Sequence, residues 1–465
     1  MPLQKNQVLT LRVERLSSDG SGVAHSPDGE TVFIPGAAPG DEARVRIVKD
    51  CKRYAFGILD EVLTPSPDRI PVDCAVAGPC GGCSLRHLDY AAELRAKQEN
   101  VADAFARIGG LDVPVLPIVG SPEVNRYRNK VQFPVGVDKS GKPCIGFYAG
   151  RTHRIVPCPD CRLQPGVLNE IGNALCAFFA EKGIQPYSEE TGRGLVRHIF
   201  LRRGAHSGQI MVCLVCTCAK LPCAEELCTR LKAQFAEITT ILLNVNAKNT
   251  NVILGTETHT LYGPGYIEDT LCGVPVQLGP LSFYQVNTLA AEQLYGIAAQ
   301  YAQLTPDDLL LDLYCGMGTI GLSMAAHCRE LIGVEIVPEA IESAKANAAR
   351  MGADVAAKSR FFCADAGQAA TRLAAEGLHP DIVMLDPPRK GCDEATLSAV
   401  VRMAPRRVVY VSCNPATAAR DAAWLEQNGY HAEKVQPVDL FPRTRHCECV
   451  IALSKGEIDS KKVRV

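Results

Sequence analysis

The stretch LLLDLYCGMGTIGLSMA, residues 309–325, decides the fold of the C-terminal part of this 465-residue chain. Its apolar run ends at Asp312, and two glycines, Gly316 and Gly318, follow before a helix-like segment begins near Gly321. Glycines in such a turn let a ligand approach the backbone closely, because a Cβ atom would block that approach. The stretch therefore predicts a strand, a ligand-binding turn and the start of a helix.

Strand-like and helix-like segments alternate around and after this stretch. The strand-like segments that follow it are LIGVEIV (331–337), RFFCADA (360–366), DIVMLDPP (381–388) and RRVVYVSCN (406–414). Helix-like segments such as PEAIESAKANAARMG separate them. The alternation predicts a doubly wound parallel sheet of the Rossmann type, and ECVIALS near the C-terminus predicts a late strand that can run antiparallel.

The glycine turn and the next strand together predict a nucleoside-cofactor site. Glu335 ends that strand about 20 residues after the turn, where an acidic side chain can bind both hydroxyls of a ribose. The spacing of the glycines also occurs in NAD-binding proteins, so spacing alone leaves NAD open. Asp365 and the LDPPRKG segment of Asp386 resemble the third and fourth motifs of Rossmann-type methyltransferases, and S-adenosylmethionine is therefore the favoured cofactor.

Cys413 stands in VVYVSCNPATAARD, residues 408–421, where a strand gives way to a turn. Because ligands of an open α/β sheet bind beyond the carboxyl ends of its strands, the thiol is expected to face the cofactor crevice. The helix start that follows is expected to favour the thiolate, and a reactive thiol is favoured over a core or metal-binding one.

A reactive cysteine beside a methyl donor fits one reaction of pyrimidines. A thiolate that adds to carbon 6 of uracil makes carbon 5 nucleophilic toward a methyl sulfonium. A base must then remove the proton on carbon 5 before the cysteine can leave. Glu448 is the candidate base, and His446 lies two residues before it.

The rest of the chain predicts two further regions. Residues 1–62 contain about five short strands broken by Gly and Pro, which predicts a small β-barrel. Residues 63–270 read as a mixed α+β region whose strands carry cations beside aromatic residues, as at 126–130 and 197–203, a pattern that suits RNA contacts. Residues 271–465, which contain the predicted Rossmann-type sheet, form the third predicted domain.

Composition limits the function classes. The chain has 49 Lys and Arg against 51 Asp and Glu, so a nucleic-acid site must be a local patch rather than a global basic surface. No apolar run is long enough for a membrane span, and the N-terminus does not read as a signal peptide, so we expect a cytoplasmic protein. Its 21 cysteines are then expected to be reduced, with a core role for the group Cys213, Cys216, Cys218, Cys223 and Cys228.

A second cysteine group lies in the Gly-rich segment VDCAVAGPCGGCSLRHL, residues 72–88. Cys74, Cys80 and Cys83 are three thiolates in one loop, which predicts a metal or iron–sulfur site with a fourth ligand from elsewhere. VPCPDCRLQP offers Cys158 and Cys161 for that position. Four thiolates also satisfy zinc, which stays as the alternative.

Five segments in a fixed order resemble the RNA (uracil-5-)-methyltransferase family. They are FYQVN, DLYCGMGTIGL, LDPPRKG, VVYVSCNPATAARD and HCECVIAL. Residues 1–62 resemble the RNA-binding TRAM barrel of that family, and the cysteine loop resembles the 4Fe-4S loop of its 23S rRNA branch. The resemblance implies methylation of a uridine in RNA, most directly 23S rRNA, with S-adenosylmethionine and a 4Fe-4S cluster as cofactors.

The resemblance also assigns residues. It implies Cys413 as nucleophile and Glu448 as base, and Cys161 as the fourth cluster ligand beside Cys74, Cys80 and Cys83. The residues it implies for the cofactor and the target base, together with those of the glycine turn, are Gln285, Tyr314, Gly316, Gly318, Glu335, Asp365 and Asp386. Cys447 and Cys449 beside the base are treated as packing residues.

Three rival readings remain at this point. Within the family, the substrate can be tRNA instead of rRNA. An NAD- or iron–sulfur-dependent oxidoreductase uses the same glycines and cysteines but gives no role to Cys413 and Glu448. A non-catalytic RNA-binding module leaves the cofactor residues without a purpose. The oligomeric state stays open, with a monomer as the working expectation.

Overall fold

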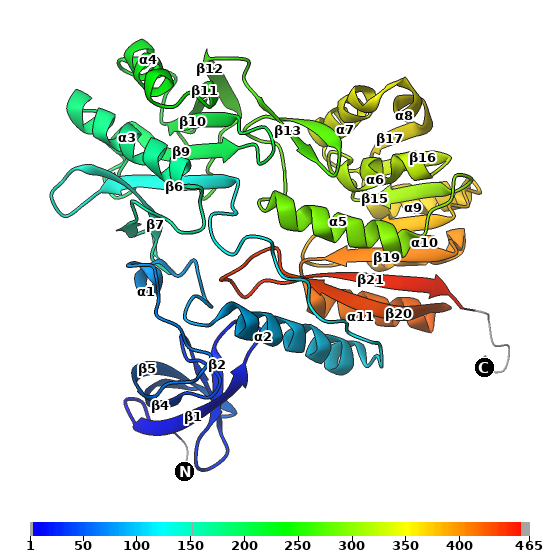
Figure 1. The fold of residues 1–465 in the computed structure, drawn as a ribbon, viewed down its shortest axis with the longest axis horizontal. Coiled ribbons are helices and arrows are strands. Elements are labelled where there is room, and N and C mark those ends of the chain that lie inside the picture. The colour runs from blue at the N-terminus through cyan, green and yellow to red at the C-terminus, as the bar shows by residue number, and fades with distance from the viewer. Residues whose placement is uncertain (1–2, 151, 457–465) are drawn as a thin grey trace.

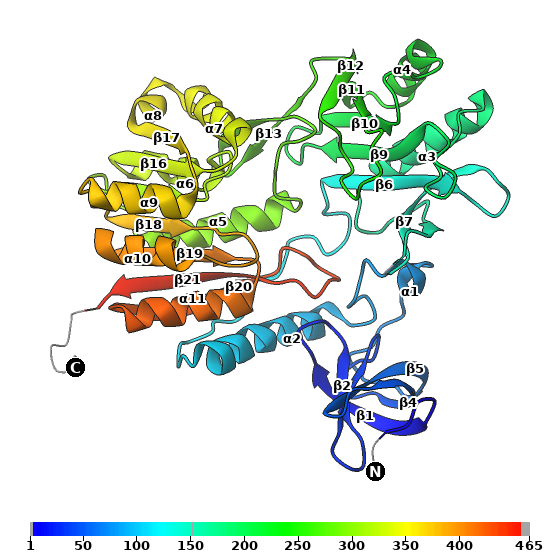
Figure 2. The ribbon, with the colours of Figure 1, turned by 180° about the vertical axis from the view of Figure 1, so that it is seen from behind.

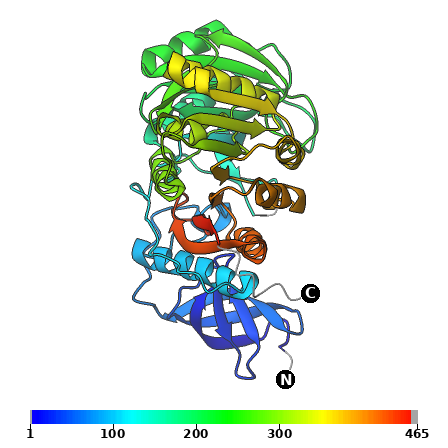
Figure 3. The ribbon, with the colours of Figure 1, turned by 90° about the vertical axis from the view of Figure 1, so that its right-hand side faces the viewer.

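The computed structural model describes residues 3–150 and 152–456, which form a small barrel, a central sheet and a larger C-terminal sheet (Figure 1). Helix α2 (Tyr90–Asp103) lies between the barrel and the C-terminal sheet when the molecule is seen from the front, from behind and from the side (Figure 1, Figure 2 and Figure 3). Within these described ranges, no helix is both long enough and apolar enough to cross a membrane.

The N-terminal strands close into the predicted barrel, in the order β1-β2-β3-β5-β4. They are β1 (Val8–Leu16), β2 (Gly22–His25), β3 (Thr31–Ile34), β4 (Glu42–Asp50) and β5 (Tyr54–Thr64). Alternate apolar residues such as Val13, Val32 and Ile47 point inward and are buried. The barrel is tight: an added Cβ on Gly57 of β5 would lie 2.3 Å from a methyl carbon of Val45.

The central region is a seven-stranded mixed sheet in the order β12-β11-β10-β9-β6-β7-β8. Its strands are β6 (Lys130–Val137), β7 (Pro143–Tyr148), β8 (Ile155–Pro157), β9 (Val196–Arg203), β10 (Ile210–Cys216), β11 (Ile238–Val245) and β12 (Glu257–Tyr262). Helices α3 (Gly166–Lys182) and α4 (Ala224–Gln234) bury one face of this sheet. The other face contributes Phe200 and Met211 to the core of the C-terminal region, so the two regions are packed together.

The hairpin of β13 (Ile267–Leu271) and β14 (Val274–Leu278) leads from the central sheet into the C-terminal sheet, whose order is β17-β16-β15-β18-β19-β21-β20. Its strands are β15 (Leu309–Leu313), β16 (Glu330–Glu335), β17 (Ser359–Cys363), β18 (Ile382–Leu385), β19 (Arg407–Ser412), β20 (Tyr430–Val438) and β21 (Glu448–Lys455). The first five strands of that order are parallel, and β21 runs antiparallel to both of its neighbours. The predicted Rossmann-type sheet and multidomain fold are confirmed.

Helices cover both faces of the C-terminal sheet (Figure 2). They are α5 (Thr288–Ala302), α6 (Thr319–Met324), α7 (Pro338–Met351), α8 (Ala353–Lys358), α9 (Ala366–Ala375), α10 (Glu394–Met403) and α11 (Pro415–Gln427), with a short 3₁₀ turn η2 (Ala325–His327) after α6. The strand order reverses between β15 and β18, and such a switch point is where an open α/β sheet forms its ligand crevice.

Residues 90–119 lie by sequence in the central region, residues 63–270, but pack on the C-terminal sheet. Helix α2 continues into a π-helical turn, η1 (Ala104–Gly109), which lies against α11. The following segment runs beside the edge strand β20, where the amide of Leu116 donates to the carbonyl of Val435 at 2.9 Å. The segment thereby covers the free edge of the sheet.

The core role expected for the Cys213 group is correct for part of it only. Cys213, Cys216 and Cys228 are buried, whereas Cys218 and Cys223 are exposed. The difference follows from position, because the exposed pair lies in the connection that leaves the end of β10 and enters α4 at the surface. All 21 cysteines are free thiols.

Candidate active site

The predicted site residues of the C-terminal region gather at one edge of its sheet. Asp312 and Glu335 lie at the carboxyl ends of β15 and β16, Asp386 follows β18, and Cys413 follows β19. Parallel strands place all their carboxyl ends on the same edge, so Asp312 and Cys413, 101 positions apart, come to line one crevice.

The turn between β15 and α6 is built from left-handed residues. Tyr314 (φ 65°), Gly316 (φ 56°) and Gly318 (φ 80°) all have positive φ, which glycine adopts without strain and tyrosine rarely adopts. Gly321 in α6 touches the strand, because an added Cβ there would lie 2.8 Å from Oδ2 of Asp312. The glycines therefore serve both the turn and the close contact of helix and strand.

Asp312 anchors this turn from below. Its Oδ2 accepts a hydrogen bond from the amide of Gly321 at 3.0 Å, and its Oδ1 has no partner among the described residues. Burial raises the pKa of Asp312 to about 8, so the carboxyl holds a proton at neutral pH. Asp312 was singled out from the sequence only as a strand end, not as a protonated buried acid.

Glu335 is held across the turn by backbone amides. Its carboxylate accepts hydrogen bonds from the amides of Gly316 (3.1 Å), Ile336 (2.8 Å) and Val337 (3.0 Å). The side chain is fixed at the crevice, where a carboxylate can accept both hydroxyls of a ribose. Asp365, which follows β17, is half-buried. It also caps α9, because its carboxylate accepts a hydrogen bond from the amide of Gln368 at 3.1 Å.

Gln285 and Asp386 approach the same buried tyrosine, Tyr295 of α5. Its hydroxyl lies 3.4 Å from that of Thr319, and burial together with the charge of Asp386 raises its pKa, while hydrogen bonds from Thr319 and Gln285 oppose the rise. Burial also raises the pKa of Asp386 itself to about 7. No sequence pattern marked Tyr295, because an inward tyrosine on an amphipathic helix reads as ordinary core.

Cys413 sits between β19 and α11 in a turn that is tied to the LDPPRKG loop. Asn414 caps α11 through its side-chain oxygen, and its side-chain amide donates to the carbonyl of Arg389 at 2.9 Å. The hydroxyl of Thr417 donates to the same carbonyl at 3.3 Å. These bonds therefore fix the position of the Cys413 turn relative to the loop after Asp386.

Antiparallel pairing brings Glu448 to Cys413. Ser412, the last residue of β19, pairs with Cys449 of β21, so the residue after β19 lies beside the first residue of β21. Glu448 is only 5% exposed, and burial together with the charge of Asp386 raises its pKa to about 8. Cys447 and Cys449 are buried on either side of it and pack in the core, as expected.

The expectation that the helix start makes Cys413 a ready thiolate is wrong. Burial raises the pKa of the Cys413 thiol, and the nearby Glu448 and Asp386 raise it further, while Arg389 offsets only part of the rise. The pKa of the thiol is therefore raised by burial in an enclosed site together with two nearby carboxylates. Arg389 was not predicted as a site residue, although its place in LDPPRKG, three residues after Asp386, was the available signal.

Cys413 opens into a cavity of about 660 Å³ that three parts of the chain share. The barrel contributes its β1–β2 loop, α2 contributes one face, and the C-terminal region contributes the segments around Cys413 and His446. Burial and the nearby cations lower the pKa of His446, which disfavours the charged imidazolium. The lining residues used below are Lys97, Arg389, Cys413 and His446.

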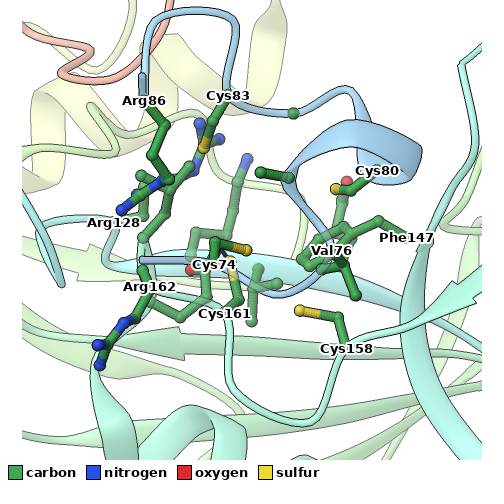
Figure 4. Close-up of a pocket in the computed structure, with 17 residues that line it drawn as sticks. Cys74, Val76, Cys80, Cys83, Arg86, Arg128, Phe147, Cys158, Cys161 and Arg162 are labelled. Atoms are coloured by element: carbon green, nitrogen blue, oxygen red, sulfur yellow. Dashed lines mark hydrogen bonds between the residues drawn. The ribbon is translucent and has the colours of Figure 1, made fainter. Parts of the chain in front are cut away.

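A second cavity, of about 290 Å³, is lined by the cysteines of the middle region. Figure 4 shows the side chains of Cys74, Cys80, Cys83, Cys158 and Cys161 around one space. Among residues 3–150 and 152–456, no three or more His, Cys, Asp or Glu side chains are arranged to hold a metal ion.

Cys158 and Cys161 differ in their surroundings. The thiol of Cys158 donates to the sulfur of Cys161, and this bond lowers the pKa of Cys161 to about 6 with help from the amides of Leu163 and Gln164. The side-chain amide of Gln164 also donates to that sulfur at 3.9 Å. The hydrogen bonds from the amides of Leu163 and Gln164 therefore favour the thiolate of Cys161.

Three features define an S-adenosylmethionine-dependent methyltransferase with a Rossmann-type domain. They are the sheet order, the glycine turn whose amides hold Glu335, and the enclosed Cys413. Comparison with known proteins is in accord: the family described as tRNA (Uracil-5-)-methyltransferase matches residues 275–456, and the TRAM domain matches residues 2–59. The chain belongs to the RNA (uracil-5-)-methyltransferase family with an N-terminal TRAM domain, and it is an RNA methyltransferase.

Its relatives cover the whole chain. An uncharacterized RNA methyltransferase of Halalkalibacterium halodurans is 43% identical over 97% of this chain and 98% of the relative. One from Listeria monocytogenes is 42% identical over 97% and 98%. Among solved structures, the tRNA (uracil-54, C5)-methyltransferase of Pyrococcus abyssi in complex with S-adenosyl-L-homocysteine has a TM-score of 0.76 and 27% identity, covering 96% of this chain and 100% of that one.

Proposed function

We propose that this cytoplasmic enzyme methylates carbon 5 of a uridine in 23S rRNA, with Cys413 as the nucleophile and Glu448 as the base. The observation that carries this proposal is the pairing of β19 with β21, which sets a buried glutamate beside a cysteine at the crevice edge. An oxidoreductase would have no use for that pair, and a binding module would have no use for the enclosed acids.

The bond changes can be followed on this chain's residues. The thiolate of Cys413 adds to carbon 6 of the target uracil, and the electron pair of the carbon 5–carbon 6 double bond makes carbon 5 nucleophilic. S-adenosylmethionine supplies the methyl group when bound. Glu448 then removes the proton from carbon 5, the double bond re-forms, and Cys413 leaves as a thiolate.

Arg389 and Glu448 assist different steps. Arg389 lowers the pKa of Cys413 and so favours its thiolate for addition to carbon 6. Burial and Asp386 raise the pKa of Glu448 to about 8, and the carboxylate form of a base with such a pKa is well matched to taking the proton from carbon 5 near neutral pH.

The cofactor residues are proposed from their positions around the turn. Gly316 and Gly318 would let the methyl donor approach the protein backbone closely, and Tyr314 and Asp365 border the turn. Glu335, which the amide of Gly316 holds in place, would accept the ribose hydroxyls. Gln285 and Asp386, which meet at Tyr295, would face the methyl donor and the target base.

A 4Fe-4S cluster is proposed at the cysteine cavity. Cys74, Cys80, Cys83 and Cys161 give the four thiolates that such a cluster requires, and they surround a space of about 290 Å³. Zinc needs four ligands converging on one ion at about 2.3 Å, and the cysteines here instead line a larger cavity. When bound, the cluster would tie residues 74–83 to the segment that carries Cys161.

The proposed division of the chain is a barrel at 1–62 and a central region at 63–270 with basic strands, both of which would hold RNA, and a domain at 271–465 that would carry out the chemistry. The ribosomal assignment rests on the cysteine loop and the barrel, which resemble the 23S rRNA branch. tRNA is the second candidate, because the Pyrococcus abyssi enzyme named for tRNA uracil-54 matches nearly the whole chain. Mapping 5-methyluridine in rRNA and tRNA of cells that lack the gene decides between them.

One assay tests the chemistry. RNA containing 5-fluorouridine should form a covalent adduct with the protein in the presence of S-adenosylmethionine, since fluorine cannot be removed as a proton is. The adduct should disappear in Cys413→Ala, and Glu448→Gln should accumulate an adduct on unmodified RNA. A wild-type protein without adduct, or an adduct that survives Cys413→Ala, refutes the mechanism.

A further inference from the structure

Helix α2 presents three polar side chains on one face to the connection that precedes Glu448. Tyr90, Glu93 and Lys97 are spaced by three and four residues, which places them above one another along the helix. They meet residues 439–447, the connection from β20 to β21. The contact joins the middle of the chain to the segment that delivers the proposed base.

Lys97 is the centre of this contact. It is 1% exposed, and its ammonium donates to Oε1 of Glu93 (2.7 Å), Oδ1 of Asp439 (2.8 Å) and the carbonyl of Phe441 (3.1 Å). An ammonium has three N–H donors, so all of them are committed within the protein. Although Lys97 lines the catalytic cavity, it is therefore not free to bind substrate.

The two carboxylates hold the connection by further bonds. Glu93 accepts from the backbone amide of Arg443 at 2.7 Å, and the guanidinium of Arg443 lies 3.5 Å from its other oxygen. Asp439 accepts from the hydroxyl of Tyr90 at 2.9 Å and from the amide of Phe441 at 3.0 Å. Two cations thus balance two buried anions, and such a group is stable only while every member is present.

The bonds continue from Lys97 to the catalytic cavity. The carbonyl of Phe441 that accepts from Lys97 also accepts from the hydroxyl of Thr444 at 2.8 Å, and that hydroxyl accepts from the amide of His446 at 3.3 Å. His446 borders the same cavity as Cys413 and stands two residues before Glu448.

From this geometry we infer that Lys97, together with Glu93 and Asp439, is a positioning residue for proton removal: it holds the 439–447 connection so that Glu448 faces Cys413. The inference rests on the proposed roles of Cys413 and Glu448. It assigns helix α2, which lies outside the methyltransferase sheet, a part in the second half of the reaction. Cysteine addition depends on β19 and the LDPPRKG loop and is expected to be insensitive to the network.

The test compares Lys97→Met with wild type in the full-length protein, using RNA and labelled S-adenosylmethionine. We expect kcat to fall on the order of 100-fold, because a displacement of about 1 Å at the base costs that much. We expect KM for RNA to stay within about twofold, since the ammonium makes no bond to substrate. An adduct on unmodified RNA should accumulate, while adduct formation with 5-fluorouridine RNA stays at the wild-type rate.

A charge-balanced variant and a matched control separate positioning from general destabilisation. Lys97→Met/Asp439→Asn removes one cation and one anion, and it should recover about tenfold of the lost kcat. Arg69→Met removes another ion pair with a fully buried partner, Asp41, but this pair joins the barrel to the segment after β5, and the variant should leave kcat unchanged. Should Lys97→Met fail to fold, Tyr90→Phe, which removes the bond to Asp439 and the acceptor of the Ser121 amide, should still lower kcat and accumulate adduct.

The outcomes are distinguishable. If wild type gives no adduct with 5-fluorouridine RNA, the proposed function fails. If wild type gives the adduct and Lys97→Met turns over unmodified RNA normally, the inference alone fails. It also fails if Lys97→Met loses the 5-fluorouridine adduct, or if Arg69→Met lowers kcat to the same extent.

Discussion

The carboxylate of Glu335, at the end of β16, accepts a hydrogen bond from the backbone amide of Gly316 in the neighbouring turn, with 3.1 Å between N and Oε2. The two residues come from adjacent parallel strand ends, and the bond fixes the acid before any ligand arrives. A preorganised carboxylate loses little conformational freedom on binding, so its contribution to cofactor affinity is expected to be large.

Replacing Glu335 with Ala should weaken binding of S-adenosylmethionine by about 2 kcal/mol, roughly 30-fold, because the ribose hydroxyls lose a charged acceptor. Isothermal titration with S-adenosylhomocysteine measures the change without turnover. Glu342→Ala, at an exposed position on α7, is the matched control and should bind normally. Equal affinity of Glu335→Ala and wild type would remove Glu335 from the cofactor site.

The rate of proton removal should depend on the ionisation of Glu448. Burial and Asp386 raise its pKa to about 8, and only the carboxylate can act as a base. Below that pKa the step should slow about tenfold per pH unit, so the decay of the adduct should quicken from pH 6 to pH 8 and then level off. Rapid-quench gels of adduct decay measure it. A decay rate that is constant across this range would contradict the assignment.

The same burial predicts that Glu448→Gln stabilises the fold at alkaline pH. A carboxyl whose folded pKa is raised from 4.5 to about 8 binds its proton more tightly in the folded state, so stability is lost as pH rises between these values. Glutamine carries no such charge, and the variant should gain about 2 to 5 kcal/mol at pH 9 and nothing at pH 4. Urea unfolding at both pH values tests this. Glu433→Gln, whose wild-type carboxylate is paired with Arg407, should show no gain at pH 9.

The two candidate fourth ligands should respond differently to substitution. Cys161→Ser should lose iron and the visible absorbance of a cluster, because the sulfur that accepts hydrogen bonds from Cys158 and Gln164 is removed. Cys158→Ser should retain both.

RNA affinity should follow the cluster rather than the chemistry. Cys80→Ser and Cys161→Ser are expected to raise KM for RNA about tenfold while methyl transfer at saturating RNA changes little, since the cavity adjoins the basic strands rather than Cys413. Cys144→Ser, at a half-buried cysteine outside the cavity, is the control. Unchanged RNA affinity combined with lost chemistry would oppose a structural role for the cluster.

Local patterns were sufficient for most of the architecture, but not for residues 90–119, which lie in the central region by sequence and pack on the C-terminal sheet. The alternation of strands and helices fixed the C-terminal sheet, because each strand needs helices to cover both faces, and the Gly and Pro breaks of the first 62 residues fixed the barrel. The strand-end positions of Glu335, Asp386 and Cys413 followed from the same alternation.

What no local pattern could supply was the arrangement of groups between elements. The pKa of Cys413 is raised rather than lowered because packing buries the thiol and brings Glu448 and Asp386, from other strands, close to it. Arg389 and Tyr295 entered the site in the same way, through contacts that only the packed structure defines.

The sequence by itself therefore determined the fold and the cofactor class, since these depend on periodicity, turn chemistry and motifs within single segments. Only the tertiary structure decided that Lys97 of helix α2, about 350 residues before Glu448, bonds to the connection that precedes Glu448. Buried charges must find their partners wherever the chain brings them together, and that meeting is a property of packing rather than of any one stretch of sequence.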